Sequence, residues 1–167
     1  MARLPVQKIQ SADDRTLPIF AELDQLADRI RMEAFNLFSR RGGGDGRALD
    51  DWVAAERDVC WPAAELAERD GAFTLGVALA GFEPAEVSVT ATPREIIVKA
   101  SHERSRQPAN DVRWSEFRSD SVLRRVELPA DVDVGRISAT LKNGLLEIIA
   151  PRVAGGSATK VPIVTGS

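Results

Sequence analysis

The residues that most often carry covalent chemistry are scarce in this chain. There is one histidine, His102, and one cysteine, Cys60. A nucleophile needs a base held beside it, and neither residue stands in a pattern that would supply such a partner. We therefore expect His102 to be a solvent-exposed histidine and Cys60 to be a packed, inert thiol.

Metal-binding and nucleotide-binding patterns are also missing from the sequence. One histidine and one cysteine do not make the ligand cluster of a zinc site. The stretch "GGGDG" at 42–46 lacks the Lys-Ser/Thr and the preceding strand of a phosphate-binding loop, and the acidic stretches at 83–89 and 131–135 lack the spacing of a calcium loop. We expect no catalytic site, no metal and no cofactor, which leaves a binding or assembly protein.

Composition restricts the function further. The chain has 167 residues, of which 44% are hydrophobic and 28% charged, and its net charge is -3. These values fit one globular domain with extensions, and they do not fit a nucleic-acid-binding protein, which would normally show a basic face. The sequence shows no apolar run long enough to span a bilayer and no signal peptide, so we expect a cytoplasmic protein.

The elements begin with a helical N-terminal region. Residues 1–16 show no periodicity and are predicted to be disordered. Apolar residues then recur at steps of three and four from 17 to 41, and a second, shorter helix is expected at 49–59. The helical region, 17–60, can bury little surface alone, so we expect it to pack on another part of the chain.

A different pattern starts at Pro62. Short alternating stretches at 72–81, 85–91, 94–101, 121–129 and 135–150 are separated by turn residues. This spacing predicts an all-β core, an immunoglobulin-like antiparallel β-sandwich over residues 62–151. Asn143-Gly144 suits a type I′ turn, because both of its positions need a positive φ. The strand after that turn is apolar on both faces and carries Leu145, Leu146, Ile148 and Ile149.

The last segment, 152–167, is predicted to be a flexible tail. It is rich in small and polar residues. The exception is an apolar motif formed by Val161, Pro162 and Ile163. Val161 and Ile163 lie two residues apart, so in an extended segment their side chains point the same way.

The hairpin at 137–152, "ISATLKNGLLEIIAPR", resembles the signature of the small heat-shock proteins, the α-crystallin domain family. The strand "SVLRRVELPADV" places Arg124 on the family's arginine, and "VPI" resembles the family's Ile-x-Ile/Val tail motif. The resemblance covers about residues 62–164. The helical region before it looks like a short module seen in uncharacterised bacterial proteins. The signature residues here are Ala139, Leu141, Asn143, Gly144, Leu145 and Leu146.

The resemblance implies an ATP-independent holdase chaperone that binds partly unfolded proteins and assembles with itself from dimers into larger oligomers. In the bacterial type the dimer exchanges a strand of the long loop, here 102–118. Trp114 and Phe117 would be its anchors, and Glu116 or Asp120 would pair with Arg124 near the dimer interface. The alternative for this loop is a polar surface loop with two locally packed aromatic residues.

The resemblance also assigns a role to the tail motif. Val161 and Ile163 would fill a groove on a neighbouring subunit, between the strands at 87–91 and 137–142. Its candidate floor is Val87, Val89, Ile137, Ala139 and Leu141. Two other functions remain open: a monomeric co-chaperone or scaffold with the same sandwich, and a family member that assembles without holding unfolded proteins. A tail that binds nothing also remains an alternative.

Overall fold

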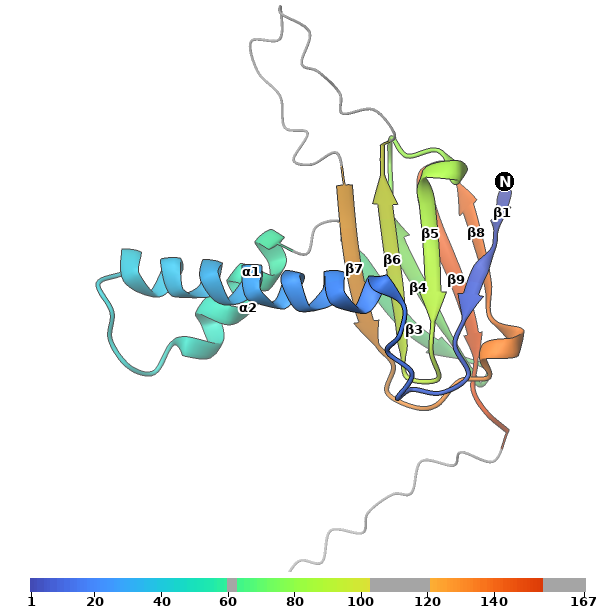
Figure 1. Cartoon of the computed structure of the whole chain (residues 1–167), viewed down its shortest axis with the longest axis horizontal. Coiled ribbons are helices and arrows are strands. Elements are labelled where there is room, and N and C mark those ends of the chain that lie inside the picture. Colours follow the sequence, from blue (N-terminus) through green and yellow to red (C-terminus); the bar gives the residue numbers. More distant parts are fainter. Residues whose placement is uncertain (60–62, 103–120, 155–167) are drawn as a thin grey trace, which may run out of the picture.

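Two β-sheets lie face to face, and a pair of helices extends from one of them (Figure 1). This arrangement comes from a computed structural model that describes residues 1–59, 63–102 and 121–154. The first sheet has the strand order β1-β8-β9-β4-β3, and the second has the order β2-β5-β6-β7. The predicted immunoglobulin-like β-sandwich is thereby confirmed.

Neighbouring strands run antiparallel in both sheets, except that β2 runs parallel to β5. Two short 3₁₀ helices, η1 (Pro84–Glu86) and η2 (Val134–Arg136), lead into strands β5 and β8. The strands are β1 (Ala2–Leu4), β2 (Val6–Lys8), β3 (Ala64–Arg69), β4 (Ala72–Ala78), β5 (Val87–Ala91), β6 (Glu95–Ser101), β7 (Ser121–Glu127), β8 (Ser138–Lys142) and β9 (Leu145–Pro151).

Alternate residues of the strands fill the space between the sheets. In β9, Leu146 and Ile148 are fully buried, whereas Leu145 and Ile149 are 50% and 40% exposed. The sandwich therefore covers one apolar face of β9 and leaves the other in contact with solvent. The largest side chains with almost no exposure in this core are Phe73, Leu75, Leu79, Ile96, Leu146, Ile148, Val77, Val89, Val98 and Val132.

The turn between β8 and β9 has the predicted backbone conformation. The φ angles of Asn143 and Gly144 are 51° and 75°, so both residues lie in the left-handed region that a type I′ turn requires. The sequence did not predict β3, because "AELAER" contains a single large apolar residue, Leu66, and so shows no clear alternation.

Two helices form an arm on the outer face of the second sheet. Helix α1 (Pro18–Arg40) crosses β6 and β7 with its first half and then extends past the sandwich, where α2 (Ala48–Val59) lies beside it (Figure 1). The sequence-based expectation that these helices pack on another part of the chain is correct. The buried residues of this contact are Ile9, Phe20, Leu23, Leu26, Ile30, Ala55 and Ile97.

The predicted disorder of residues 1–16 is wrong. This segment contains β1 and β2, and each strand extends one edge of a different sheet. Strands of three residues are too short to show an alternating pattern. Their stability comes from pairing with β8 and β5, which lie far along the chain, so the local sequence carries little sign of them.

Candidate functional site: the groove between strands β5 and β8

The candidate site lies along one side of the sandwich, where β5 and β8 would be edge strands if β1 and β2 were removed. The residues predicted to form the floor of a groove here are all buried in the main core. They are Val87, Val89, Ile137, Ala139 and Leu141. Residues 2–9, which we call the N-terminal strap, pair along both strands where this groove is predicted.

The strap pairs with both strands that border the groove. Leu4 lies opposite Ala139 on β8, and Val6 lies opposite Val89 on β5. Leu4 is 8% exposed and belongs to the main core, and the half-buried Val6 packs against the same core. Pro5 is exposed between them, at the point where the chain passes from one sheet to the other.

Beyond Val6 the strap makes further contacts. The Ile9 backbone N–H donates to the carbonyl oxygen of Ala91 at 2.8 Å, and the Ile9 side chain is buried under α1. The Lys8 ammonium donates to the carbonyl oxygen of Gly135 at 2.6 Å. The strap is therefore attached to the second sheet, to the α1 contact and to η2, which precedes β8.

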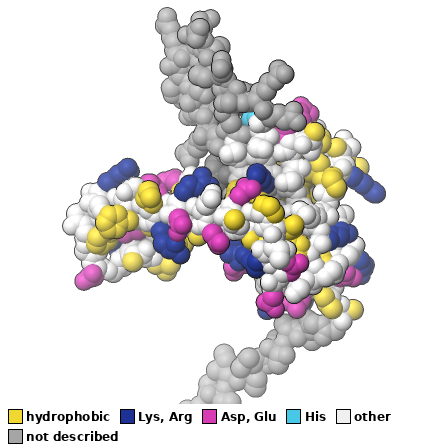
Figure 2. All heavy atoms as spheres, in the orientation of Figure 1, with side chains coloured by type: hydrophobic (Ala, Val, Ile, Leu, Met, Phe, Trp, Pro, Cys, Tyr) yellow, Lys and Arg dark blue, Asp and Glu magenta, His cyan; other side chains and the backbone are white. Residues whose placement is uncertain are grey.

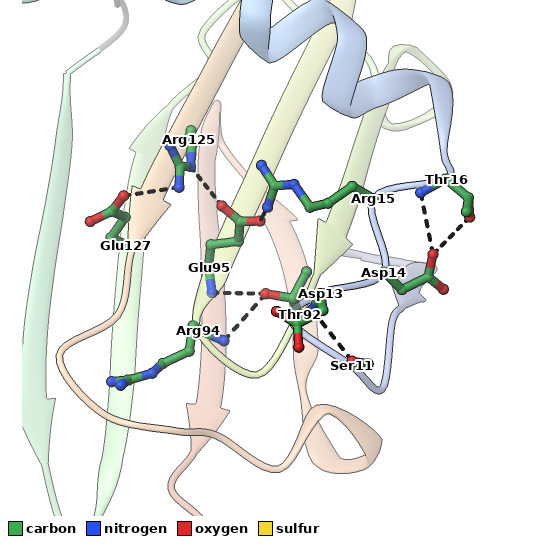
Figure 3. Close-up of polar contacts among 10 residues, drawn as sticks. All are labelled: Ser11, Asp13, Asp14, Arg15, Thr16, Thr92, Arg94, Glu95, Arg125 and Glu127. Carbon is green, nitrogen blue, oxygen red and sulfur yellow. Dashed lines mark hydrogen bonds and ion pairs between the residues drawn. The ribbon is translucent and has the colours of Figure 1, made fainter.

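A buried carboxylate anchors the chain between the strap and α1 (Figure 3). Glu95, at the start of β6, accepts from Arg15 with one oxygen and from Arg125 of β7 with the other, the latter at 2.6 Å. Arg125 also pairs with Glu127 at 2.9 Å. The hydroxyl of Thr92 accepts the backbone N–H groups of Arg94 and Glu95, which fixes the turn that carries Glu95. Two guanidinium groups thus neutralise one carboxylate that is almost inaccessible to water.

The helical arm carries a second feature, a set of exposed apolar side chains (Figure 2). On each helix the exposed apolar residues are three or four positions apart, so they lie on one side of that helix. Their exposed fractions run from 37% to 74%. We call these exposed apolar side chains of the two helices the arm patch; they are Met32, Phe35, Phe38, Leu49, Trp52 and Val53.

An ion pair joins the two helices next to the arm patch. Arg41 donates to both carboxylate oxygens of Asp51, the shortest distance being 2.7 Å from Nη2 to Oδ2. These hydrogen bonds lower the pKa of Asp51 below its ordinary value, although burial of the carboxylate acts in the opposite direction. The guanidinium of Arg41 also lies 5.1 Å from the centre of the Phe38 ring.

The prediction that His102 is exposed to solvent is wrong. Its ring stacks on Phe82 with the ring centres 4.4 Å apart, and its Nδ1 lies 2.9 Å from a carboxylate oxygen of Glu86. The charged sequence around His102 hid these partners, because both come from the segment that leads into β5. Among the described residues, no group of histidine, cysteine and acidic side chains could hold a metal ion.

Several other predicted residues lie outside the described part of the chain. These are Cys60, the loop residues Trp114, Glu116, Phe117 and Asp120, and the tail motif Val161, Pro162 and Ile163. Arg124 lies on β7, as predicted for the arginine-bearing strand. In the described ranges, neither helix is long and apolar enough to cross a lipid bilayer.

A family model matches this sandwich. The model of the Hsp20/alpha crystallin family matches residues 65–164. The chain belongs to this family. Members of the Hsp20 family are small heat-shock chaperones that form oligomers and are generally not enzymes. A second model, of a protein family of unknown function (DUF2934), matches residues 25–59, which include most of α1 and all of α2.

Individual relatives agree with the family match. The chain is 22% identical over 138 residues to a 17.8 kDa class II heat shock protein of Zea mays, covering 81% of this chain and 84% of the relative. Heat shock protein 16 of Schizosaccharomyces pombe is 27% identical over 95 residues, 55% of this chain and 66% of the relative.

Solved structures show the same fold. Heat shock protein 16.0 of Schizosaccharomyces pombe superposes with a TM-score of 0.52 and 29% identity, over 63% of this Hsp20 chain and 82% of that chain. A small heat-shock protein from Xylella fastidiosa gives a TM-score of 0.51 and 24% identity, over 65% of this chain and 99% of that chain.

The strap is the part of the site that sequence reasoning missed. A signal for it exists, because Leu4-Pro5-Val6 repeats the apolar-Pro-apolar pattern of Val161-Pro162-Ile163. The pattern at the tail was interpreted as a groove-filling motif, and the same pattern near the N-terminus was not.

Proposed function

We propose that this protein is an ATP-independent holdase chaperone that binds partly unfolded proteins, limits their aggregation and works as a dynamic oligomer of dimers. Membership of the Hsp20 family supports a chaperone. The observation that carries client binding is the arm patch, because six large apolar side chains remain exposed on the two helices. Large apolar side chains that stay exposed close together are typical of a binding site for apolar partners.

Client binding can be tested with the full chain. Phe35→Ser/Trp52→Ser should reduce the suppression of heat-induced aggregation of a model client, measured by light scattering, by at least about half, since two large aromatic contacts are lost. Val153→Ser is the matched control, because Val153 is 47% exposed but lies after β9, away from the arm. Equal suppression by the wild type and the double variant would reject the arm patch as the client site.

Dimer formation is proposed through strand exchange in the loop at 102–118. Within the described residues, β3 has a neighbour on one side only, β4. Its other edge offers unpaired backbone groups to a strand from a second copy. Trp114 and Phe117 are proposed as the anchors of that strand, and Glu116 or Asp120 as the partner of Arg124 at the interface.

Larger assembly is proposed through the tail motif. Val161 and Ile163 of one copy would occupy the groove between β5 and β8 of another. Each aliphatic side chain contributes about 1.5 to 3 kcal/mol when fully buried, so one tail is a weak link and several tails together hold an oligomer that still exchanges subunits.

The cytoplasmic location stays a prediction from the sequence.

The solution mass tests this assembly. Light scattering should find a large oligomer for the full chain and dimers for Val161→Ala/Ile163→Ala. A full-length protein that is a monomer would contradict both the exchanged dimer and the tail-linked oligomer. That result would favour the second candidate, a co-chaperone or scaffold that uses the same sandwich alone.

A further inference from the structure

We infer that the N-terminal strap is an internal competitor for the groove between β5 and β8: Leu4-Pro5-Val6 of each chain occupies the place that Val161-Pro162-Ile163 of a neighbouring copy would take. The inference rests on the proposed tail-in-groove assembly. It adds that a groove becomes available to another copy only when its own strap has left.

The two segments have the same chemistry. Each presents two branched aliphatic side chains separated by one proline. In an extended segment, residues two apart point to the same side. The strap shows what such a segment does at this site, because Leu4 and Val6 both pack against the core while Pro5 between them is exposed.

The strap and a second segment cannot share the groove. β1 pairs with β8 over Ala139 to Leu141, and β2 pairs with β5 over Val89 to Ala91. The outward backbone groups of an edge strand can pair with one neighbour at a time. The apolar side chains of the strap also occupy the space beside the floor residues, since Leu4 belongs to the same core cluster and Val6 packs against it.

The strap nevertheless has few contacts that hold it on the sandwich. Its two strands have three residues each, and Leu4 and Ile9 are its only buried side chains. Arg3, Pro5, Gln7 and Lys8 are exposed. Segments with short pairing and few buried contacts open at the low end of the stability range of a folded protein.

The ion pair of Arg15 with Glu95 sets how firmly the strap is held. Arg15 ties the connection between strap and α1 to the sheet, and Glu95 keeps its second partner, Arg125, when Arg15 is removed (Figure 3). Removal of Arg15 therefore loosens the strap without leaving a buried carboxylate unpaired. Since Ile9 is buried in the same cluster as Phe20 and Ile97, the strap is also coupled to the seating of α1.

The test measures binding of a fluorescent peptide of residues 157–166 to the full chain by anisotropy. The protein carries Val161→Ala/Ile163→Ala, so its own tail does not compete. A closed strap lowers the apparent affinity by the fraction of molecules that are open. Adding Leu4→Ala/Val6→Ala should tighten peptide binding at least about tenfold, since the strap loses its apolar contacts with the sandwich core and keeps only those of Ile9.

Two further variants keep the test independent of changes in the core. Arg15→Ala should tighten binding by a smaller factor, up to about fivefold, as expected for a partly exposed ion pair. Arg3→Ala should change nothing, because Arg3 belongs to the strap but its side chain is exposed. A peptide of the same residues with alanine at both aliphatic positions measures non-specific binding.

The outcomes separate the inference from the proposed function. If the peptide binds with equal affinity whether or not the strap is weakened, the strap does not compete, and tail-in-groove assembly stands without it. If the peptide binds to none of the variants, while a peptide of residues 2–10 binds to the strap-weakened protein, the groove selects the strap. That result overturns both the tail-linked assembly and the competition.

Discussion

Gly144, in the turn between β8 and β9, is a position where alanine should be costly for two separable reasons. Its φ is 75°, a region that costs an L-residue about 1 to 2 kcal/mol. A Cβ atom there would lie 2.9 Å from the Cα of Ala80, which is backbone and cannot rotate away. The carbonyl oxygen of Gly144 also accepts the Leu79 backbone N–H at 2.6 Å, so the two segments cannot separate without losing that bond.

We expect Gly144→Ala to lower the free energy of unfolding by about 2 to 5 kcal/mol, the sum of the backbone term and an overpacking term of about 1 to 3 kcal/mol. Urea denaturation followed by tryptophan fluorescence measures the change. Gly71→Ala is the matched control, because Gly71 has the same φ of 75° and a Cβ atom there would have no neighbouring atom within 4 Å. It should lose the backbone term alone. Equal losses in the two variants would refute the contact with Ala80 as a cause.

Three further predictions concern the arm and its anchors. The hydrogen bonds from Arg41 lower the pKa of Asp51, so this pair should stabilise the arm above about pH 4 and lose its effect as the pH falls through the lowered pKa. In the variant Asp51→Asn, the helicity of α2 measured by circular dichroism should depend less on acid pH. Ile97→Ala should cost about 2 to 5 kcal/mol and speed hydrogen exchange in α1, since Ile97 is buried between α1 and the sheet; unchanged exchange would contradict this packing role. Glu95→Ala should lower the melting temperature clearly more than Glu127→Ala, because only Glu95 is a buried acceptor of two guanidinium groups, each such bond being worth about 1.5 to 3 kcal/mol.

Much of the fold could be predicted because its strands are locally patterned. The stretches that became β4 to β9 alternate or carry β-branched residues, and the Asn143-Gly144 turn has a conformation that few other pairs adopt easily. Strand β3 was missed because Leu66 is its only large apolar residue. The period of α1 was visible, but its position on Ile97 depends on tertiary packing that no local pattern encodes.

The sequence could locate the two strands of the candidate site but not the segment that pairs with them. The five predicted floor residues are buried in the core and lie in β5, in β8 or directly before β8. That they form a groove for a second segment stays a prediction. The occupant of the groove could not be predicted in the same way. A strand of three residues shows no period, and Leu4 and Val6 gain their burial from strands far along the chain.

The strap and the strands β5 and β8 are related because all of them concern the unpaired backbone groups at sheet edges. Without the strap, β5 and β8 would each be an edge strand of five residues, with the outward backbone groups of alternate residues unpaired. Long exposed edges pair readily with other chains, and very short edge strands reduce that risk. The strap replaces both edges with strands of three residues. The backbone groups that would bind a neighbour's tail are thus the groups that need protection in a single chain, so protection and assembly are alternative uses of the same two strands.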